Sequence, residues 1–311
     1  MLKSHFIGEW IMEMHEILRF FRKKLGFTQK EILPDLDPSV YSRIESGKQE
    51  LKINDLKTIL NSMSLSPKEV FSITSLDEEQ RKFKTLFYFC VQNLDDQIQK
   101  KCLINYYHKI SSKNKNLREL SNYIAVKSYF VHFWDEIDEI TPEELDYTYS
   151  LVMNKNYHQH YDFVLIRNTI RLLDKGRTDL IISKFFLTNQ GQPDKPAVND
   201  SVYYILINAI STRIYEKDYD EARRYIQLAK RQDKERKNLN YRINLKYLEN
   251  LLDYITVGDY QYMERIQEYI HILKDIGDSF TAEQIKTEVK EVLNNITEDG
   301  DKNKLIVISA N

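Results

Sequence analysis

The sequence predicts an all-α protein, and two properties support this fold class. Prolines and glycines are rare, with six and eight in 311 residues, while Leu, Ile, Lys, Glu and Tyr are abundant, as is typical of helices joined by short turns. Apolar residues recur at helical spacing along most of the chain. The chain is 42% hydrophobic and 30% charged, the balance of a globular protein, and its length indicates more than one domain.

Several classes of protein are excluded. No run of about 18 uncharged apolar residues occurs and the N-terminus lacks a signal-peptide pattern, so we expect a cytoplasmic protein without membrane contact. Cys90 and Cys102 do not form a CxxC pair, so neither disulfides nor zinc are expected. His158 and His160 fall on different sides of a helix, and nucleotide-binding and catalytic motifs are absent from the sequence. We expect no enzyme, no metal and no cofactor.

Five short helices are predicted in the first seventy-two residues. Gly26 ends the first helix, which has an apolar stripe from Ile17 onward. Thr28, with a glutamate three residues later, forms a capping box that opens a short second helix. Asp37 followed by Pro38 is a strong start signal for the third. The third, fourth and fifth helices are then expected over 38–45, about 53–63 and 67–71.

This order of helices resembles the Cro/repressor family of helix-turn-helix proteins. The resemblance is carried by Thr28-Gln29 and by the string SRIESGK over residues 42–48. In that family the third helix lies in the major groove and the start of the second touches the DNA backbone. The resemblance implies double-stranded operator DNA as a partner, with Gln29 and Lys48 at phosphates. The implied DNA-binding residues are Thr28, Gln29, Ser39, Val40, Ser42, Arg43 and Lys48.

Some features of this segment depart from the family or leave an alternative. The stretch between Gln29 and Ser42 is about two residues shorter than usual, and Pro38 replaces a common base-reading residue. Arg43 and Glu45 have the alternative of pairing with neighbours across the small core.

Two further expectations concern burial and charge in this segment. Tyr41 is expected in the core, between an exposed Val40 and an exposed Ser42. From Met12 to Ile73, ten Lys/Arg face nine Asp/Glu, so a single copy should bind DNA weakly. Dimerisation supplies more phosphate contacts, and we expect a homodimer, with a tetramer as the alternative.

Eleven further helices are predicted, which implies stacked helical hairpins. The clearest repeat pairs 203–230 with 245–272, an offset of about forty residues that suits a tetratricopeptide-like (TPR-like) solenoid. The predicted helices are 78–93, 95–111, 117–134, 142–154, 158–173, 176–188, 198–216, 219–233, 239–257, 260–276 and 280–295. The predicted domains are a helix-turn-helix domain over 1–72, a linker over 73–78, a TPR-like sensing and dimerisation domain over 79–296 and a C-terminal tail over 297–311.

A narrower resemblance, to PrgX-type regulators, spans nearly the whole chain. It is carried by Ile205–Ser211, Asp220–Ile226, Leu273–Gly277 and, near the N-terminus, Ser39–Tyr41 with Arg43 and Glu45. PrgX-type regulators belong with Rgg and PlcR among the peptide-pheromone receptors of Gram-positive bacteria. The resemblance implies a quorum-sensing regulator, acting as a repressor, whose operator binding is controlled by a short hydrophobic peptide. Activation and relief of repression both stay open as the effect of the peptide.

A polar stripe on helix 198–216 supports a peptide groove. Tyr204, Asn208, Ser211 and Tyr215 occupy positions i, i+4, i+7 and i+11 of a helix that is apolar on most other sides. An asparagine amide offers one acceptor and two donors, so it can clamp the backbone of an extended peptide.

Neighbouring helices are expected to add polar residues to the same wall of the groove. Asn168 and Arg171 lie on one of them, and Asn244 and Tyr247 on another. Each residue has the alternative of packing helices or facing solvent. The predicted peptide-binding residues are Asn168, Arg171, Tyr204, Asn208, Ser211, Asn244 and Tyr247.

The last segment differs from the rest of the chain. Leu305–Ser309 has the apolar, β-branched character of a short strand. The resemblance implies that this tail takes part in the response to peptide, and the alternative is a frayed end.

One alternative function stays open at the level of sequence. In this alternative the chain is a helical-repeat scaffold, or a regulator that senses a protein partner instead of a peptide. A palindromic or repeated operator near its own gene, and a neighbouring short gene for a hydrophobic precursor, would favour the peptide-sensing regulator.

Overall fold

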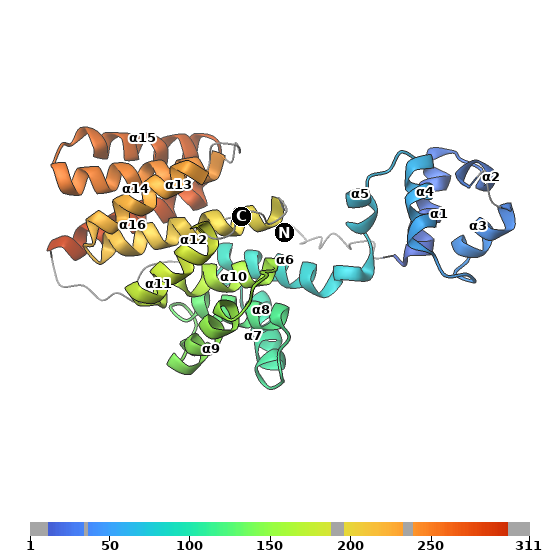
Figure 1. Ribbon diagram of the computed structural model, residues 1–311, viewed down its shortest axis with the longest axis horizontal. Helices are drawn as coiled ribbons and strands as arrows, with labels where there is room; N and C mark the ends of the chain where they lie inside the picture. The colour runs from blue at the N-terminus through green and yellow to red at the C-terminus, as the bar shows by residue number, and fades with distance from the viewer. Residues whose placement is uncertain (1–11, 34–36, 188–195, 233–238, 298–311) are drawn as a thin grey trace. The chain divides into compact units, whose positions relative to one another are not determined.

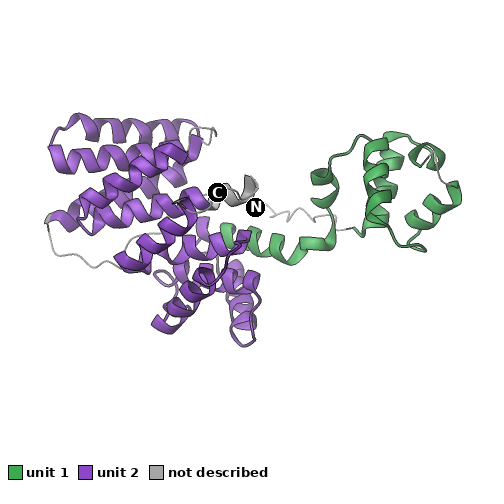
Figure 2. Cartoon of the chain, in the orientation of Figure 1, with its two compact units in different colours: residues 1–88 green, residues 89–311 purple. Residues whose placement is uncertain are grey.

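The computed structural model describes residues 12–33, 37–187, 196–232 and 239–297. Secondary structure in these ranges is helical apart from an isolated bridge between Met12 and Thr74, so the all-α prediction is confirmed. Two compact units, residues 1–88 and 89–311, divide the chain (Figure 2). The strand expected at Leu305–Ser309 lies outside the described residues.

The first unit contains the five short helices that the sequence predicts (Figure 1). They are α1 (Met14–Leu25), α2 (Gln29–Ile32), α3 (Pro38–Glu45), α4 (Ile53–Ser62) and α5 (Pro67–Phe71), followed by a 3₁₀ turn (Ser75–Asp77) and α6 (Glu78–Gln92). Gly26 ends α1 in the left-handed conformation with φ 80°, which glycine adopts at no steric cost. The Asp37 carboxylate caps α3 by accepting a hydrogen bond from the Ser39 amide at 2.8 Å. The boundaries are therefore set by local chemistry.

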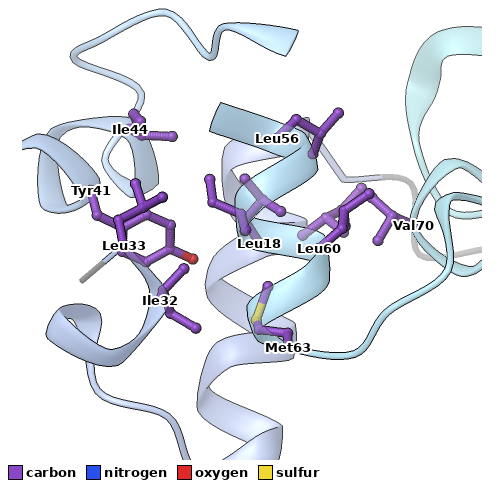
Figure 3. Packing of buried hydrophobic residues seen from close by; sticks show 11 residues of the cluster. Leu18, Ile32, Leu33, Tyr41, Ile44, Leu56, Leu60, Met63 and Val70 are labelled. Atoms are coloured by element: carbon purple, nitrogen blue, oxygen red, sulfur yellow. The ribbon is translucent and has the colours of Figure 1, made fainter. Parts of the chain in front are cut away.

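A small hydrophobic core joins these helices (Figure 3). Leu18, Tyr41, Ile44 and Leu60 are all buried in it, which confirms the prediction for Tyr41. Val40 differs from the prediction, since it is half-buried and packs against this core.

The burial of Val40 follows from helical geometry. Val40 lies one turn before the buried Ile44, at the edge of the inward face of α3. Ser42 is half-buried as well. The expectation that Val40 and Ser42 are exposed was therefore wrong, and the exposed strip of α3 is narrower than predicted.

The second unit begins within α6 and continues through ten further α-helices in the described ranges. Their bounds are α7 (Gln97–Ser111), α8 (Leu117–Phe130), α9 (Pro142–Met153), α10 (His160–Thr169), α11 (Lys175–Ile182), α12 (Pro196–Tyr215), α13 (Tyr219–Gln232), α14 (Leu239–Val257), α15 (Gln261–Asp275) and α16 (Ser279–Thr297). The predicted helix 158–173 ends instead in a 3₁₀ turn at Ile170–Leu172, and 176–188 ends in a π turn at Ser183–Leu187. The predicted helix 117–134 stops at Phe130, whose ring stacks on Trp134 at 4.0 Å.

From α12 to α16, each helix packs against the next, as the repeat pattern predicts. The turn between α12 and α13 places Lys217 at φ 63°, and the turn between α14 and α15 places Gly258 at φ 80°. Both turns thus use a left-handed residue just before an Asp-Tyr pair. Helix α12 contacts both α10 and α14, so side chains from these three helices share one wall of the solenoid.

Candidate functional site

The exposed strip of α3 carries two of the residues implied in DNA contact. Ser39 and Arg43 are exposed, and the Arg43 guanidinium donates to Ser39 Oγ at 3.2 Å and to Gln49 Oε1 at 3.0 Å. Both acceptors are neutral, so neither of these hydrogen bonds is an ion pair. The alternative in which Arg43 pairs across the core does not occur. Gln49, which orients Arg43, was missed by the sequence analysis.

Glu45, in contrast, pairs across the core. Arg22 donates two hydrogen bonds to the Glu45 carboxylate, from Nε at 2.5 Å and from a second nitrogen at 3.0 Å, and Gln29 Nε2 donates to the same carboxylate at 2.9 Å. Burial alone would raise the pKa of Glu45, but these hydrogen bonds outweigh it and hold the pKa below its usual range. One amide donor of Gln29, implied to bind phosphate, is therefore directed inward, and α1, α2 and α3 are tied together.

Thr28 and Lys48 flank this strip. Thr28 is exposed at the start of α2, where its amide donates to Glu31 at 2.7 Å, so the predicted capping box is present. Lys48 is exposed after Gly47, which has φ 69°. A Cβ on Gly47 would meet the His15 ring at 3.2 Å, so both conformation and space favour glycine in this turn.

The seven predicted peptide-binding residues come together in the second unit, but they are buried. Asn168, Tyr204, Asn208, Ser211, Asn244 and Tyr247 are at most 7% exposed, and the Arg171 side chain is 5% exposed. The expectation that the stripe lines an open surface was therefore wrong. Helix α16 packs on α12 and closes the wall.

The link between α16 and the wall is Glu288. Its Oε1 accepts hydrogen bonds from Arg171 at 3.3 Å and from the Ser211 hydroxyl, and its Oε2 accepts from the Tyr247 hydroxyl. Burial raises the pKa of Tyr247 well above its ordinary value, and the charge of Glu288 adds to this, so Tyr247 remains a donor. Three of the predicted residues thus share one buried carboxylate.

Glu288 was missed by the sequence analysis, although α16 carries a signal for it. Ile285, Val289 and Val292 are buried at helical spacing, and Glu288 occupies a position on the same face. An acidic residue within an apolar stripe needs a buried partner. That signal indicates a contact without naming the groups that provide it.

A row of three asparagines lies one helical turn away from the Glu288 donors. Asn168, Asn208 and Asn244 each stand three residues before Arg171, Ser211 and Tyr247, on α10, α12 and α14. Asn208 Nδ2 donates to the Arg167 carbonyl at 2.9 Å. Among the described residues, Asn168 Nδ2, Asn208 Oδ1 and Asn244 Oδ1 have no hydrogen-bond partner although all three are buried.

These unpartnered atoms carry an energetic cost. A buried polar group without a partner costs roughly 1–3 kcal/mol, so three of them in one row require an explanation. The row offers one donor and two acceptors from three adjacent helices. An extended backbone, with alternating N–H and C=O groups, has the matching pattern.

Comparison with protein families identifies the family to which the second unit is related. The model of the C-terminal domain of the HTH-type transcriptional regulator Rgg matches residues 92–287, which is more than half of the chain. The chain belongs to the Rgg family of transcriptional regulators. This match contains all seven wall residues and ends one residue before Glu288. Among the described helices of this Rgg family member, none is long and apolar enough to span a membrane.

Solved structures show the same fold over nearly the whole chain. A PrgX/cCF10 complex has 17% identity and a TM-score of 0.72, covering 90% of this chain and 99% of that one. The SHP pheromone receptor Rgg2 of Streptococcus dysgalactiae has 15% identity and a TM-score of 0.68, with coverages of 90% and 99%. A putative transcriptional regulator of Listeria monocytogenes has 14% identity and a TM-score of 0.71, with coverages of 91% and 98%. No curated protein sequence matches the chain.

Proposed function

We propose that this Rgg family member is a cytoplasmic repressor whose operator binding is controlled by a short hydrophobic peptide bound in the helical-repeat unit. The observation that carries the proposal is the row of buried, unpartnered amide atoms on Asn168, Asn208 and Asn244. Similar structures support it, since they include a PrgX/cCF10 complex and the SHP pheromone receptor Rgg2. The proposal assigns the chain no catalytic reaction and no cofactor.

The row sets the length of peptide that fits. Packed helices lie about 8–10 Å apart, so crossing from α10 over α12 to α14 spans roughly 16–20 Å. An extended chain covers about 3.3 Å per residue, which gives a footprint of about five or six residues. Because the row is buried, a slender extended segment inserted between helices suits it better than the surface of a folded protein. This favours a peptide over a protein partner.

The DNA-contacting surface follows from the exposed strip of α3. We assign base contacts to Ser39 and Arg43, which are exposed on α3. Thr28, Gln29 and Lys48 then contact phosphates, as helix starts and lysines commonly do. Val40 and Ser42 stand at the half-buried edge of the interface.

The direct test uses operator binding with and without peptide. Short duplexes from the region upstream of the gene are titrated with the full chain, and a synthetic library of eight-residue apolar peptides is then added. The proposal expects specific binding that a subset of peptides changes by at least about tenfold. Specific binding that no peptide alters would contradict peptide control.

Replacing Asn208 by Ala tests the asparagine row. We expect peptide affinity to fall by about tenfold or more, because one lost hydrogen-bonding pair has roughly that effect. Isothermal calorimetry with the tightest-binding library peptide measures it. Asn250→Ala is the matched control. Asn250, on α14, is buried like Asn208, but its amide donates to the Lys246 carbonyl within the same helix. Equal losses in both variants would contradict the assignment.

A homodimer is the expected DNA-binding form. The first unit is nearly neutral, with ten basic and nine acidic residues between Met12 and Ile73, so two copies are needed for enough phosphate contacts. Sedimentation at micromolar concentration should give at least twice the chain mass of 37.2 kDa, and a tetramer would give four times that mass. A strict monomer that still binds DNA tightly would contradict this expectation.

A further inference from the structure

The donors of the wall converge on a carboxylate that belongs to the chain itself. Arg171, Ser211 and Tyr247 come from three different stretches of the helical unit, and all three donate to Glu288 of α16. Both carboxylate oxygens are used. A cation with two hydroxyl donors around one carboxylate is the arrangement of a carboxylate-binding site, because charge-assisted hydrogen bonds are the strongest that side chains make.

The attachment of α16 through this carboxylate is suited to exchange. A buried ion pair adds little net stability, since its attraction is largely offset by the cost of removing both charges from water. If the carboxylate of another molecule displaces Glu288 and accepts the same three hydrogen bonds, the balance between attraction and desolvation stays nearly unchanged. The contacts made by the rest of an incoming molecule then decide which carboxylate occupies the site.

We propose that Glu288 is an internal ligand, and that a carboxylate carried by the peptide displaces it from Arg171, Ser211 and Tyr247 and thereby releases α16. The inference rests on the proposed peptide function and extends it to the chemistry of the ligand and to the element that responds. The carboxylate comes either from the C-terminus of the peptide or from an acidic side chain, which present the same group.

The asparagine row supports this assignment independently. Asn168, Asn208 and Asn244 retain unpartnered buried atoms, and each lies three residues before a Glu288 donor, about 4.5 Å along its helix. A backbone held by the row therefore brings a carboxylate to the site within one or two residues. The unmet hydrogen bonds and the carboxylate site therefore lie on the same helices, one turn apart.

A second contact attaches α16 to α12 further along. Asn295 Nδ2 donates to the Tyr215 carbonyl at 2.6 Å. The two helices run in the same direction, because Ser211 and Tyr215 on α12 meet Glu288 and Asn295 on α16 in that order. Loss of the Glu288 contact therefore removes the polar attachment of the middle of α16, while Asn295 and the buried Ile285, Val289 and Val292 still hold the helix, so the release is partial.

The first experiment compares Glu288→Gln with Glu283→Gln. Both variants remove one acidic group from α16, but Glu283 is exposed and pairs with Lys274. With eight-residue apolar peptides ending in a free carboxylate, we expect about tenfold tighter binding to Glu288→Gln, because a neutral amide competes less well for Arg171. No change is expected for Glu283→Gln. Equal affinity of both variants and the unaltered chain would overturn the proposal.

Two further peptide libraries, compared with the free-carboxylate library, identify which carboxylate of the peptide binds. One ends in a carboxamide, and the other ends in a carboxamide and contains one internal aspartate. Because the apolar peptides carry a carboxylate only at the C-terminus, a loss of about tenfold for the first library shows that the C-terminus occupies the site. No loss for the first library together with tighter binding of the second assigns the site to an acidic side chain. Equal binding of all three libraries would overturn the proposal.

The second experiment keeps the chain unaltered, in case Glu288→Gln does not fold. Hydrogen exchange of the backbone amides of residues 279–296 is followed at saturating peptide, and exchange at least about tenfold faster than in the free chain is expected if α16 is released. Unchanged exchange with bound peptide overturns the inference and leaves the proposed function standing. If no peptide binds to the unaltered chain or to Glu288→Gln, both fail together.

Discussion

Replacing Arg22 by Met is expected to destabilise the N-terminal unit by about 3–5 kcal/mol, because it leaves the Glu45 carboxylate buried without its charged partner. The Glu45 side chain is 4% exposed and is gripped by Arg22 through two nitrogens. Arg22 also donates to the Phe27 carbonyl at 2.9 Å, a bond that Met cannot make. Hydrogen exchange of α1 to α4 measures the loss, which is a large part of the stability of a small unit.

A double variant separates the stranded charge from lost packing. In Arg22→Met combined with Glu45→Leu both charges are gone, and apolar replacements of a buried pair are often close to neutral. We expect this variant to regain most of the lost stability. A double variant as unstable as Arg22→Met alone would show that the carboxylate is not the cause.

The pH dependence gives an internal check on the same variant. The pKa of Glu45 is lowered in the folded chain, so its contribution to stability is present above the unfolded pKa and is lost as the pH falls through the lowered value. Without Arg22, burial favours the neutral carboxyl. The penalty of Arg22→Met should therefore be smaller near pH ~4 than near pH ~7. A penalty independent of pH would contradict the ion-pair explanation.

The fold could be predicted where the signals are local. Gly26, the Thr28 capping box and Asp37 set helix boundaries through contacts within a few residues, and a single sequence contains all of that information. The Asp-Tyr repeat near Lys217 and Gly258 likewise reflects a turn geometry. These elements follow from backbone chemistry that does not depend on the rest of the chain.

The candidate sites depend on contacts between distant residues, and the prediction fell short there. Arg171 and Glu288 are 117 positions apart, and Arg22 and Glu45 are 23 apart. Helical spacing placed Asn208 and Ser211 on one stripe correctly, but it cannot tell whether solvent or another helix faces that stripe. The sequence therefore predicted the members of the wall without predicting the helix that covers it.

The same limit explains the error on α3. The alternation of buried and exposed positions was placed correctly at Tyr41, whereas Val40 lies where the core of this small unit extends one residue further. The width of a buried face depends on the neighbouring helices, which periodicity alone does not describe. The exposed strip of α3 then carries Ser39 and Arg43.

Replacing Arg43 by Ala is expected to remove sequence-specific operator binding. A well-placed arginine discriminates a base by about 1–3 kcal/mol, and a dimer uses it twice, so about 2–6 kcal/mol is lost, which is roughly thirtyfold or more. Arg43 is exposed and its hydrogen bonds go to Ser39 and Gln49, so the helical circular-dichroism signal should not change. Fluorescence anisotropy with operator and scrambled duplexes measures the effect.

Lys48→Ala is the matched control for this experiment, because Lys48 is also exposed and positively charged but is assigned to a phosphate. It should weaken operator and scrambled duplexes about equally and reduce the salt dependence of binding by about one phosphate contact per subunit. Arg43→Ala should instead bring operator affinity down towards that of the scrambled duplex and leave the latter nearly unchanged. If Arg43→Ala kept its preference for the operator, base recognition would have to be assigned to other residues of the exposed strip.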